Sequence, residues 1–213
     1  MNRFLEKIQI TKKGHVKMQA VVFIDNSETF MGLRKCCAQH NKSYIIDYSK
    51  FARSLSSDIP KEIAGMYFYA EEHMTYNRPE QSEFFNRLQS FGFQTYVSSI
   101  GTVKDICPKC NGLVKIRRVA KDGEIPELIT IHALDILYTN SQITTFIFMI
   151  CSSRYLPLIK KLRDVGKKVA VISFGVSDAI ATACSNIYDI RDMELLVEKR
   201  VKQYAPYKGE DDG

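Results

Sequence analysis

The feature that most constrains the fold is an alternation of short apolar runs with segments of helical periodicity. Five runs have the length and the β-branched or aromatic content of buried strands, and they cover residues 20–24, 65–69, 93–97, 145–150 and 169–172. Between them, residues 79–91 and 155–165 space their apolar side chains as helices do, and Gly follows each segment. This alternation predicts an α/β fold in which helices cover both faces of a parallel sheet.

Length and composition fit one large domain. The chain has 213 residues, and its apolar content of 45% is enough for a full core. The longest apolar run, residues 143–151, is about half the ~20 residues that a membrane helix needs. The first residues lack the apolar stretch of a secretory signal. We therefore expect no membrane partner and an intracellular, cytoplasmic location.

Residues 98–126 interrupt the alternation and contain Cys107 and Cys110, followed at once by Asn-Gly, a strong turn signal. The segment is expected to form an inserted β-hairpin or a zinc-knuckle-like unit, since two cysteines separated by two residues form the turn that zinc knuckles use. A structural zinc site needs four ligands, and no second pair follows at the usual spacing. A second copy of the chain could complete the site, as could His132, Cys36 or Cys37. The alternative is a surface turn with unmetallated thiols.

The charge balance favours a polyanionic partner. The formal net charge is +6, which is compatible with nucleic acid as well as with a mildly basic protein that has no such partner. Basic residues gather in the cysteine-containing segment and near residue 160, and the candidate phosphate contacts there are Lys115, Arg117, Arg118, Lys160 and Lys161. Such runs also occur as solvated faces, so the pattern supports RNA binding without establishing it.

Asp25 ends the first apolar run, and Glu28 follows three residues later. Ligands of a parallel α/β sheet bind outside the carboxyl ends of its strands, so Asp25 is well placed for function. Phosphodiester cleavage with Mg²⁺ or Mn²⁺ requires several carboxylates at one place. Asp25 fits equally well as a helix N-cap, because an Asp before a helix accepts its free amides.

Three segments of the chain together resemble the NYN domain family. The first is residues 22–28 with Asp25, the second is residues 134–137 with Asp135, and the third is residues 150–158 followed by residues 166–171. The resemblance covers roughly residues 19–196. It implies a PIN-like (Rossmann-type) fold, a metal-dependent ribonuclease ancestry and RNA as a partner. We expect an N-terminal extension at residues 1–18, an NYN/PIN-like domain at 19–204 that includes the segment 98–126, and a flexible tail at 205–213.

The chain departs from the family pattern after the central strand. Family members typically read Ser-Gly-Asp-Ser-Asp-Phe there, whereas residues 150–155 read Ile-Cys-Ser-Ser-Arg-Tyr. Arg154 in place of a carboxylate opposes metal binding; it could instead contact phosphate or cover a helix start. By the resemblance, Asp25 and Asp135 remain candidates for catalysis and for one Mg²⁺ or Mn²⁺ ion. Glu28 could serve as a replacement acid.

Three functions follow as alternatives. The leading hypothesis is an NYN-domain protein that binds RNA or a ribonucleoprotein partner, with weakened or lost metal-dependent ribonuclease activity. The second is an active Mg²⁺- or Mn²⁺-dependent endoribonuclease that uses displaced acids. The third is an interaction protein that docks a protein partner, or a second copy of itself, through the cysteine-containing segment and binds no nucleic acid.

Overall fold

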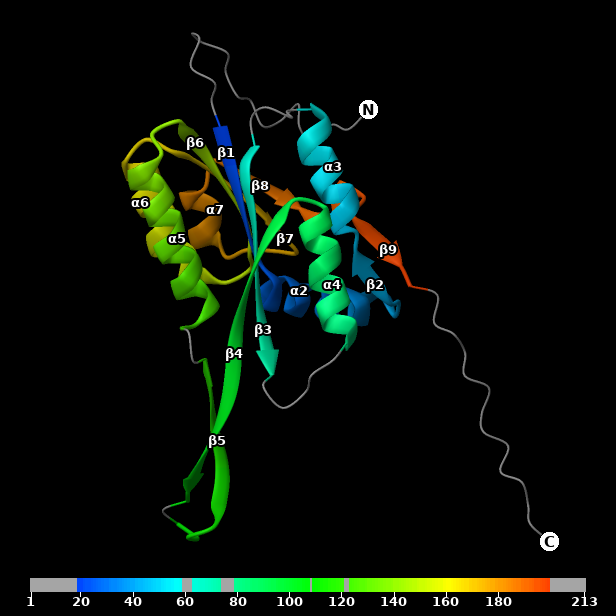
Figure 1. Cartoon of the computed structure of the whole chain (residues 1–213), viewed down its shortest axis with the longest axis vertical. Coiled ribbons are helices and arrows are strands. Elements are labelled where there is room, and N and C mark those ends of the chain that lie inside the picture. The colour runs from blue at the N-terminus through cyan, green and yellow to red at the C-terminus, as the bar shows by residue number, and fades with distance from the viewer. Residues whose placement is uncertain (1–18, 59–62, 74–78, 108, 121–122, 200–213) are drawn as a thin grey trace, which may run out of the picture.

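The computed structural model describes residues 19–58, 63–73, 79–107, 109–120 and 123–199. The expected extension at 1–18 and tail at 205–213 lie outside these ranges. A central sheet is built from β1 (Gln19–Asp25), β3 (Ile63–His73), β4 (Phe93–Ile106), β5 (Leu113–Ala120), β6 (Ile143–Met149), β7 (Lys168–Ser173) and β8 (Asn186–Asp189). Its seven strands lie in the order β5-β4-β3-β1-β6-β7-β8 (Figure 1).

All neighbouring strands of this sheet are parallel except β4 and β5, which are antiparallel. The chain runs outward from β1 to β5, returns to place β6 on the other side of β1, and then continues outward to β8. The strand order therefore reverses between β1 and β6, where sheets of this kind bind ligands. The predicted α/β fold is confirmed, and each of the five predicted strand runs overlaps a strand of the sheet.

Helices cover both faces of the sheet. One face carries α5 (Ile125–Thr139), α6 (Leu156–Asp164) and α7 (Asp178–Ala183), and the other carries α3 (Tyr48–Asp58) and α4 (Pro79–Ser90). Alternate residues of β1 divide between the two cores, because successive side chains of a strand point to opposite faces. Val21 and Phe23 belong to the core under α5 and α6, whereas Val22 and Ile24 belong to the core under α3 and α4.

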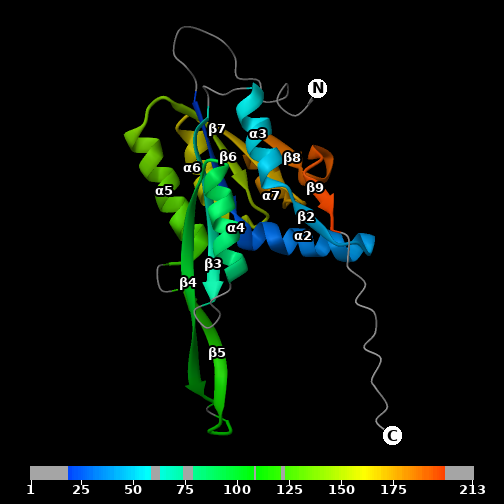
Figure 2. The same ribbon diagram turned by 45° about the vertical axis from the view of Figure 1, so that its right-hand side comes forward.

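α2 (Asn26–His40) runs across the carboxyl ends of the strands (Figure 2). Gly32 allows this close approach: a Cβ atom there would lie 2.6 Å from Cδ2 of Phe174, which follows β7. Two short 3-10 helices also lie near this edge, η1 (Ser153–Tyr155) and η2 (Ile190–Met193). A separate antiparallel pair consists of β2 (Tyr44–Ile46) and β9 (Leu196–Glu198). In the ranges that the structure covers, no helix is long and apolar enough to cross a membrane.

β4 and β5 form a hairpin that extends well past the helices (Figure 1). Its tip is a turn that includes Cys107 and residues 109–112. The N–H of Cys107 donates to the carbonyl of Gly112, and the N–H of Asn111 donates to the carbonyl of Cys107, both at 2.9 Å. Asn111 adopts a left-handed conformation with φ of 54°, which Asn tolerates better than most residues do. The two cysteines therefore sit at the far end of the hairpin.

Candidate acidic cleft at the carboxyl edge of the sheet

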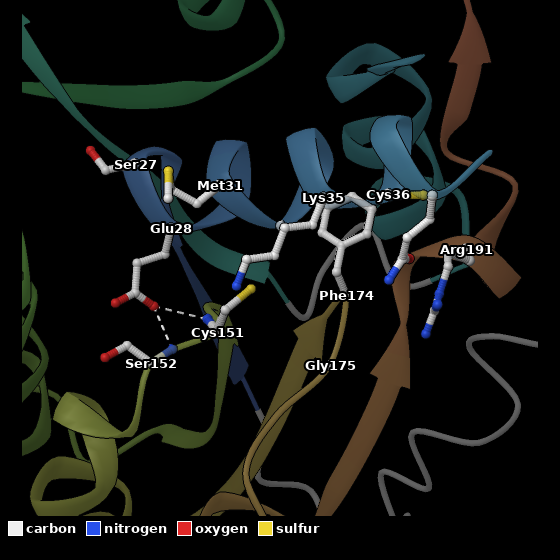
Figure 3. Close-up of a pocket in the computed structure, with 12 residues that line it drawn as sticks. Ser27, Glu28, Met31, Lys35, Cys36, Cys151, Ser152, Phe174, Gly175 and Arg191 are labelled. Atoms are coloured by element: carbon white, nitrogen blue, oxygen red, sulfur yellow. Dashed lines mark hydrogen bonds between the residues drawn. The ribbon is translucent and has the colours of Figure 1, made fainter. Parts of the chain in front are cut away.

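A cleft of about 580 Å³ lies where β1, β6 and β7 end, between α2 and the segment after β7 (Figure 3). It coincides with the reversal of strand order between β1 and β6. Its lining combines acidic, basic, aromatic and backbone groups, contributed by Glu28, Lys35, Cys151, Ser152, Phe174 and Arg191. The position is the one at which the sequence analysis expected a ligand to bind.

Asp25 ends β1 and is 1% exposed. Its Oδ1 accepts the N–H of Glu28 at 3.1 Å, so Asp25 is the N-cap of α2, as one of the two interpretations of the sequence held. Its Oδ2 accepts the hydroxyl of the buried Tyr155 at 2.6 Å. Burial raises the pKa of Asp25 from 3.8 to about 6; the hydrogen bonds from Tyr155 and from the Glu28 amide act against this shift, and the Glu28 carboxylate adds to it.

Glu28 ties the first turn of α2 to the end of β6. Its Oε2 accepts the backbone N–H of Cys151 at 2.9 Å and that of Ser152 at 2.6 Å (Figure 3). Hydrogen bonds to an ionised acceptor are among the stronger ones in proteins. The carboxylate is therefore fixed over the segment where the family pattern has aspartates.

Arg154 binds a different acid, since its guanidinium forms an ion pair with Glu124. Glu124 is the N-cap of α5, and its side chain and that of Glu127 form a capping box. The Arg154 side chain is 53% exposed, so this pair adds little stability. Sequence reasoning did not single out Glu124 or Glu127. The signal was present in their spacing around Pro126 at the start of a helix.

Asp135 lies on the exposed side of α5. Glu124 contacts Arg154, so the N-terminal end of α5 lies at the carboxyl edge of the sheet. Asp135 follows Glu124 by eleven residues, which corresponds to ~16 Å along a helix axis. The side chain lies near His132, whose pKa is lowered by burial and raised in part by the Asp135 charge. The structure thus brings Asp25 and Glu28 together and leaves Asp135 away from them.

The donor set at this edge does not fit a centre for several Mg²⁺ or Mn²⁺ ions. Both oxygens of Asp25 and one oxygen of Glu28 already accept hydrogen bonds from the protein. Throughout the described ranges, no group of three or more His, Cys, Asp or Glu side chains is arranged to hold a metal ion. Hard cations of this type bind through converging oxygen ligands that are free to coordinate.

Two basic residues that the sequence did not single out line the cleft, and they come from different elements. Lys35 lies on the same side of α2 as Glu28, seven residues later, and that helical spacing was a usable signal. Arg191 of η2 also lines the cleft, and its Nε donates to Oδ1 of Asp189 at 2.8 Å. Of the predicted phosphate contacts, Lys160 and Lys161 are exposed on α6. The remaining three, Lys115, Arg117 and Arg118, lie on β5.

An aromatic cluster lies on the face of β3 and β4 beside α5. Tyr96 is 40% exposed and stacks on Tyr69, with ring centroids 4.9 Å apart and planes at 11°. His132 packs against both rings and against Tyr67. The exposed Tyr96 ring has its geometry fixed by this packing. Such a ring is suited to stack on a nucleobase.

The Cys107 and Cys110 sulfurs lie together at the hairpin tip. The amides of Lys109 and Cys110 and the Cys110 thiol hydrogen-bond to the Cys107 sulfur and lower its pKa. The proposed completing ligands are engaged elsewhere: Cys36 is buried in α2, the Cys37 sulfur accepts the Tyr44 N–H, and His132 bonds to Tyr69. Among the described side chains, none of these residues gathers with the two cysteines, so a zinc site at Cys107 and Cys110 stays a prediction.

The fold and the cleft together define an α/β protein of the PIN-like class, with an acidic site at the carboxyl edge of a parallel sheet. The NYN domain family matches residues 19–191, and the chain belongs to this family. The resemblance noted in the sequence is thereby confirmed. NYN domains have a nuclease-like fold and are associated with RNA.

Comparison with solved structures supports the fold. The chain is similar to a protein of unknown function from Vibrio parahaemolyticus, with a TM-score of 0.62 and 18% identity over 87% of this chain and 100% of that one. It also matches a Sir2 protein in complex with the inhibitor EX-527, with a TM-score of 0.40 and 12% identity over 83% of this chain and 90% of the other. A similarity at that level carries no functional argument. No curated protein matches the chain.

Proposed function

We propose that this NYN protein binds RNA, alone or in a ribonucleoprotein, and that its metal-dependent ribonuclease activity is weakened or lost. The observation that carries the proposal is the engagement of two carboxylates by the protein itself: Glu28, which lines the cleft, and Asp25, which is buried beside it. Asp25 is held by Tyr155 and by the amide of Glu28, and the Glu28 carboxylate is held by two amides at the end of β6. Coordinating a divalent ion through these oxygens would compete with those hydrogen bonds.

The cleft has the chemistry to bind a phosphate and the base next to it. Lys35 supplies positive charge, Arg191 lines the same cleft in an ion pair with Asp189, and Phe174 supplies an aromatic ring. A volume of about 580 Å³ lies within the range of pockets that hold small ligands, about 300–1,000 Å³. The charged Glu28 fixes the backbone of Cys151 and Ser152, so these residues present a rigid wall. The formal net charge of +6 favours approach of a polyanion.

RNA binding through the cleft is tested with a matched pair of charge reversals on α2. Lys35 lines the cleft, whereas its exposed neighbour Arg34 does not. We expect Lys35→Glu to weaken binding of a fluorescent single-stranded RNA about 10-fold and to reduce the salt dependence by about one phosphate contact. Arg34→Glu changes the net charge equally and should weaken binding less than about 3-fold. Equal effects of the two variants would contradict binding in the cleft.

The active endoribonuclease remains the second candidate, favoured by one observation. Glu28 lies close enough to Asp25 to raise its pKa, so two carboxylates do meet at the strand edge. RNA incubated with the protein and Mn²⁺ distinguishes the candidates: turnover that is lost in Asp25→Asn would identify an enzyme. If no RNA binding is measurable at ~50 mM salt, neither candidate stands and the interaction-protein hypothesis is favoured.

A further inference from the structure

The tip of the β4–β5 hairpin has the backbone of a metal-binding knuckle. The turn is closed by reciprocal hydrogen bonds between Cys107 and the Asn111–Gly112 pair, and two amides point at the Cys107 sulfur. Gly112 lies against the other sulfur, because a Cβ atom there would be 3.4 Å from Sγ of Cys110. The chain is therefore folded tightly around two adjacent sulfurs. Amide donors of this kind stabilise thiolates that coordinate a metal ion.

Two sulfurs form half of a structural zinc site, which is tetrahedral and has four protein ligands. Among the side chains that the structure describes, no further His, Cys, Asp or Glu joins them. Cys110 is exposed, and both views show the hairpin projecting away from the helices (Figures 1 and 2). The described side chains therefore supply two of the four ligands, and the exposed tip leaves room for two more from another molecule.

We propose that Cys107 and Cys110 from two copies of this chain bind one zinc ion between two hairpin tips. A second copy supplies the same pair of sulfurs, and a two-fold axis through the ion turns two half-sites into one site with four thiolates. Each thiol gives its proton to solvent as it binds the ion. This site is independent of RNA binding in the cleft.

Charge at the tip supports pairing of two copies. Zinc with four thiolates carries a net charge of −2, and each tip brings one exposed Lys109, the residue before Cys110. The two ammonium groups offset the charge of the site. A second copy therefore satisfies both the ligand count and the charge balance.

The proposal is tested on the full chain, purified without chelators, by native mass spectrometry together with elemental analysis. We expect a dimer with 0.5 zinc per chain, which becomes a monomer when a chelator removes the metal. The double variant Cys107→Ser/Cys110→Ser should be a zinc-free monomer with an unchanged circular dichroism spectrum. Cys184→Ser, which removes a partly buried cysteine on another element, should keep both zinc and dimer. Lys109→Glu should weaken the dimer.

Each other outcome overturns the proposal. One zinc per chain in a monomer would mean that ligands from the same chain complete the site. A chain without zinc, or a dimer that survives chelation or the double substitution, would show that zinc does not join two tips. Substitution by Co²⁺ gives an independent readout, because the visible spectrum of a four-thiolate site differs from that of a site with two thiolates.

Discussion

Replacement of Asp25 by Asn is expected to stabilise the protein at neutral pH. The carboxyl is 1% exposed, and burial raises its pKa from 3.8 to about 6 even though Tyr155 and the Glu28 amide hydrogen-bond to it. A carboxyl whose pKa is higher in the folded state binds its proton more tightly there. The stabilisation of the folded state that comes from this tighter proton binding is complete below pH 3.8 and is lost as the pH rises through about 6. Above that pH, the buried ionised carboxylate lowers the free energy of unfolding.

The size of the effect follows from the shift in pKa. The difference between about 6 and 3.8 is about 2.2, and at 1.36 kcal/mol for each pKa unit it corresponds to about 3 kcal/mol. Asn serves equally well as an N-cap, so the start of α2 is retained. The Tyr155 hydroxyl would have to accept a hydrogen bond from the new amide instead of donating one, which costs up to ~1 kcal/mol. We therefore expect a net gain of ~2 to ~3 kcal/mol at pH 7.5.

Urea denaturation of the wild type and Asp25→Asn at pH 7.5 and pH 4 measures this gain. It should be present at pH 7.5 and largely absent at pH 4, where the wild-type carboxyl is mostly protonated in the folded state. Tyr155→Phe is the matched control: it removes the hydroxyl that favours the ionised form, so it should destabilise the protein more at pH 7.5 than at pH 4. A gain of equal size at both pH values, or none at pH 7.5, would refute the reasoning.

Two further substitutions test the contacts that shape the cleft. Glu28→Gln removes the charged acceptor of two backbone amides and should lower the free energy of unfolding by ~1 to ~3 kcal/mol, measured by urea denaturation. It should also lower the pKa of Asp25, because the repulsion between the two carboxylates is lost, and a shifted pH profile of stability would show this. Gly32→Ala places a Cβ atom 2.6 Å from the Phe174 ring and should cost ~1 to ~3 kcal/mol, whereas an unchanged melting temperature would mean that the ring moves freely.

The sequence predicted the sheet well because hydrophobic periodicity is a local property. Each of the five apolar runs overlaps a strand, and the segments at 79–91 and 155–165 became α4 and the η1–α6 unit. β8 was missed because it has four residues, of which the first two are exposed, so it lacks the continuous apolar pattern of a buried strand. The strands β2 and β9 were also missed, because each has only three residues and is too short to show a periodic pattern.

The site was predicted only in part, because its contacts join distant parts of the chain. Asp25 was found from its place at a strand end, and its capping role is equally local. The role of Glu28 depends on amides 123 and 124 residues away, which no spacing rule reveals. Asp135 was assigned from the resemblance, whereas the direction of α5 sets it away from the strand ends. Phe174 and Arg191 reach the cleft only through the fold.

A combined binding and cleavage experiment on one RNA tests the central claim most directly. Labelled single-stranded and structured RNAs are incubated with the full chain in Mg²⁺ and in Mn²⁺, and both the bound fraction and the strand length are followed. We expect RNA that is bound in a salt-dependent manner and stays intact over many hours, with the same result for Asp25→Asn. Multiple turnovers by the wild type that disappear in Asp25→Asn would contradict the claim and identify the cleft as an active ribonuclease site.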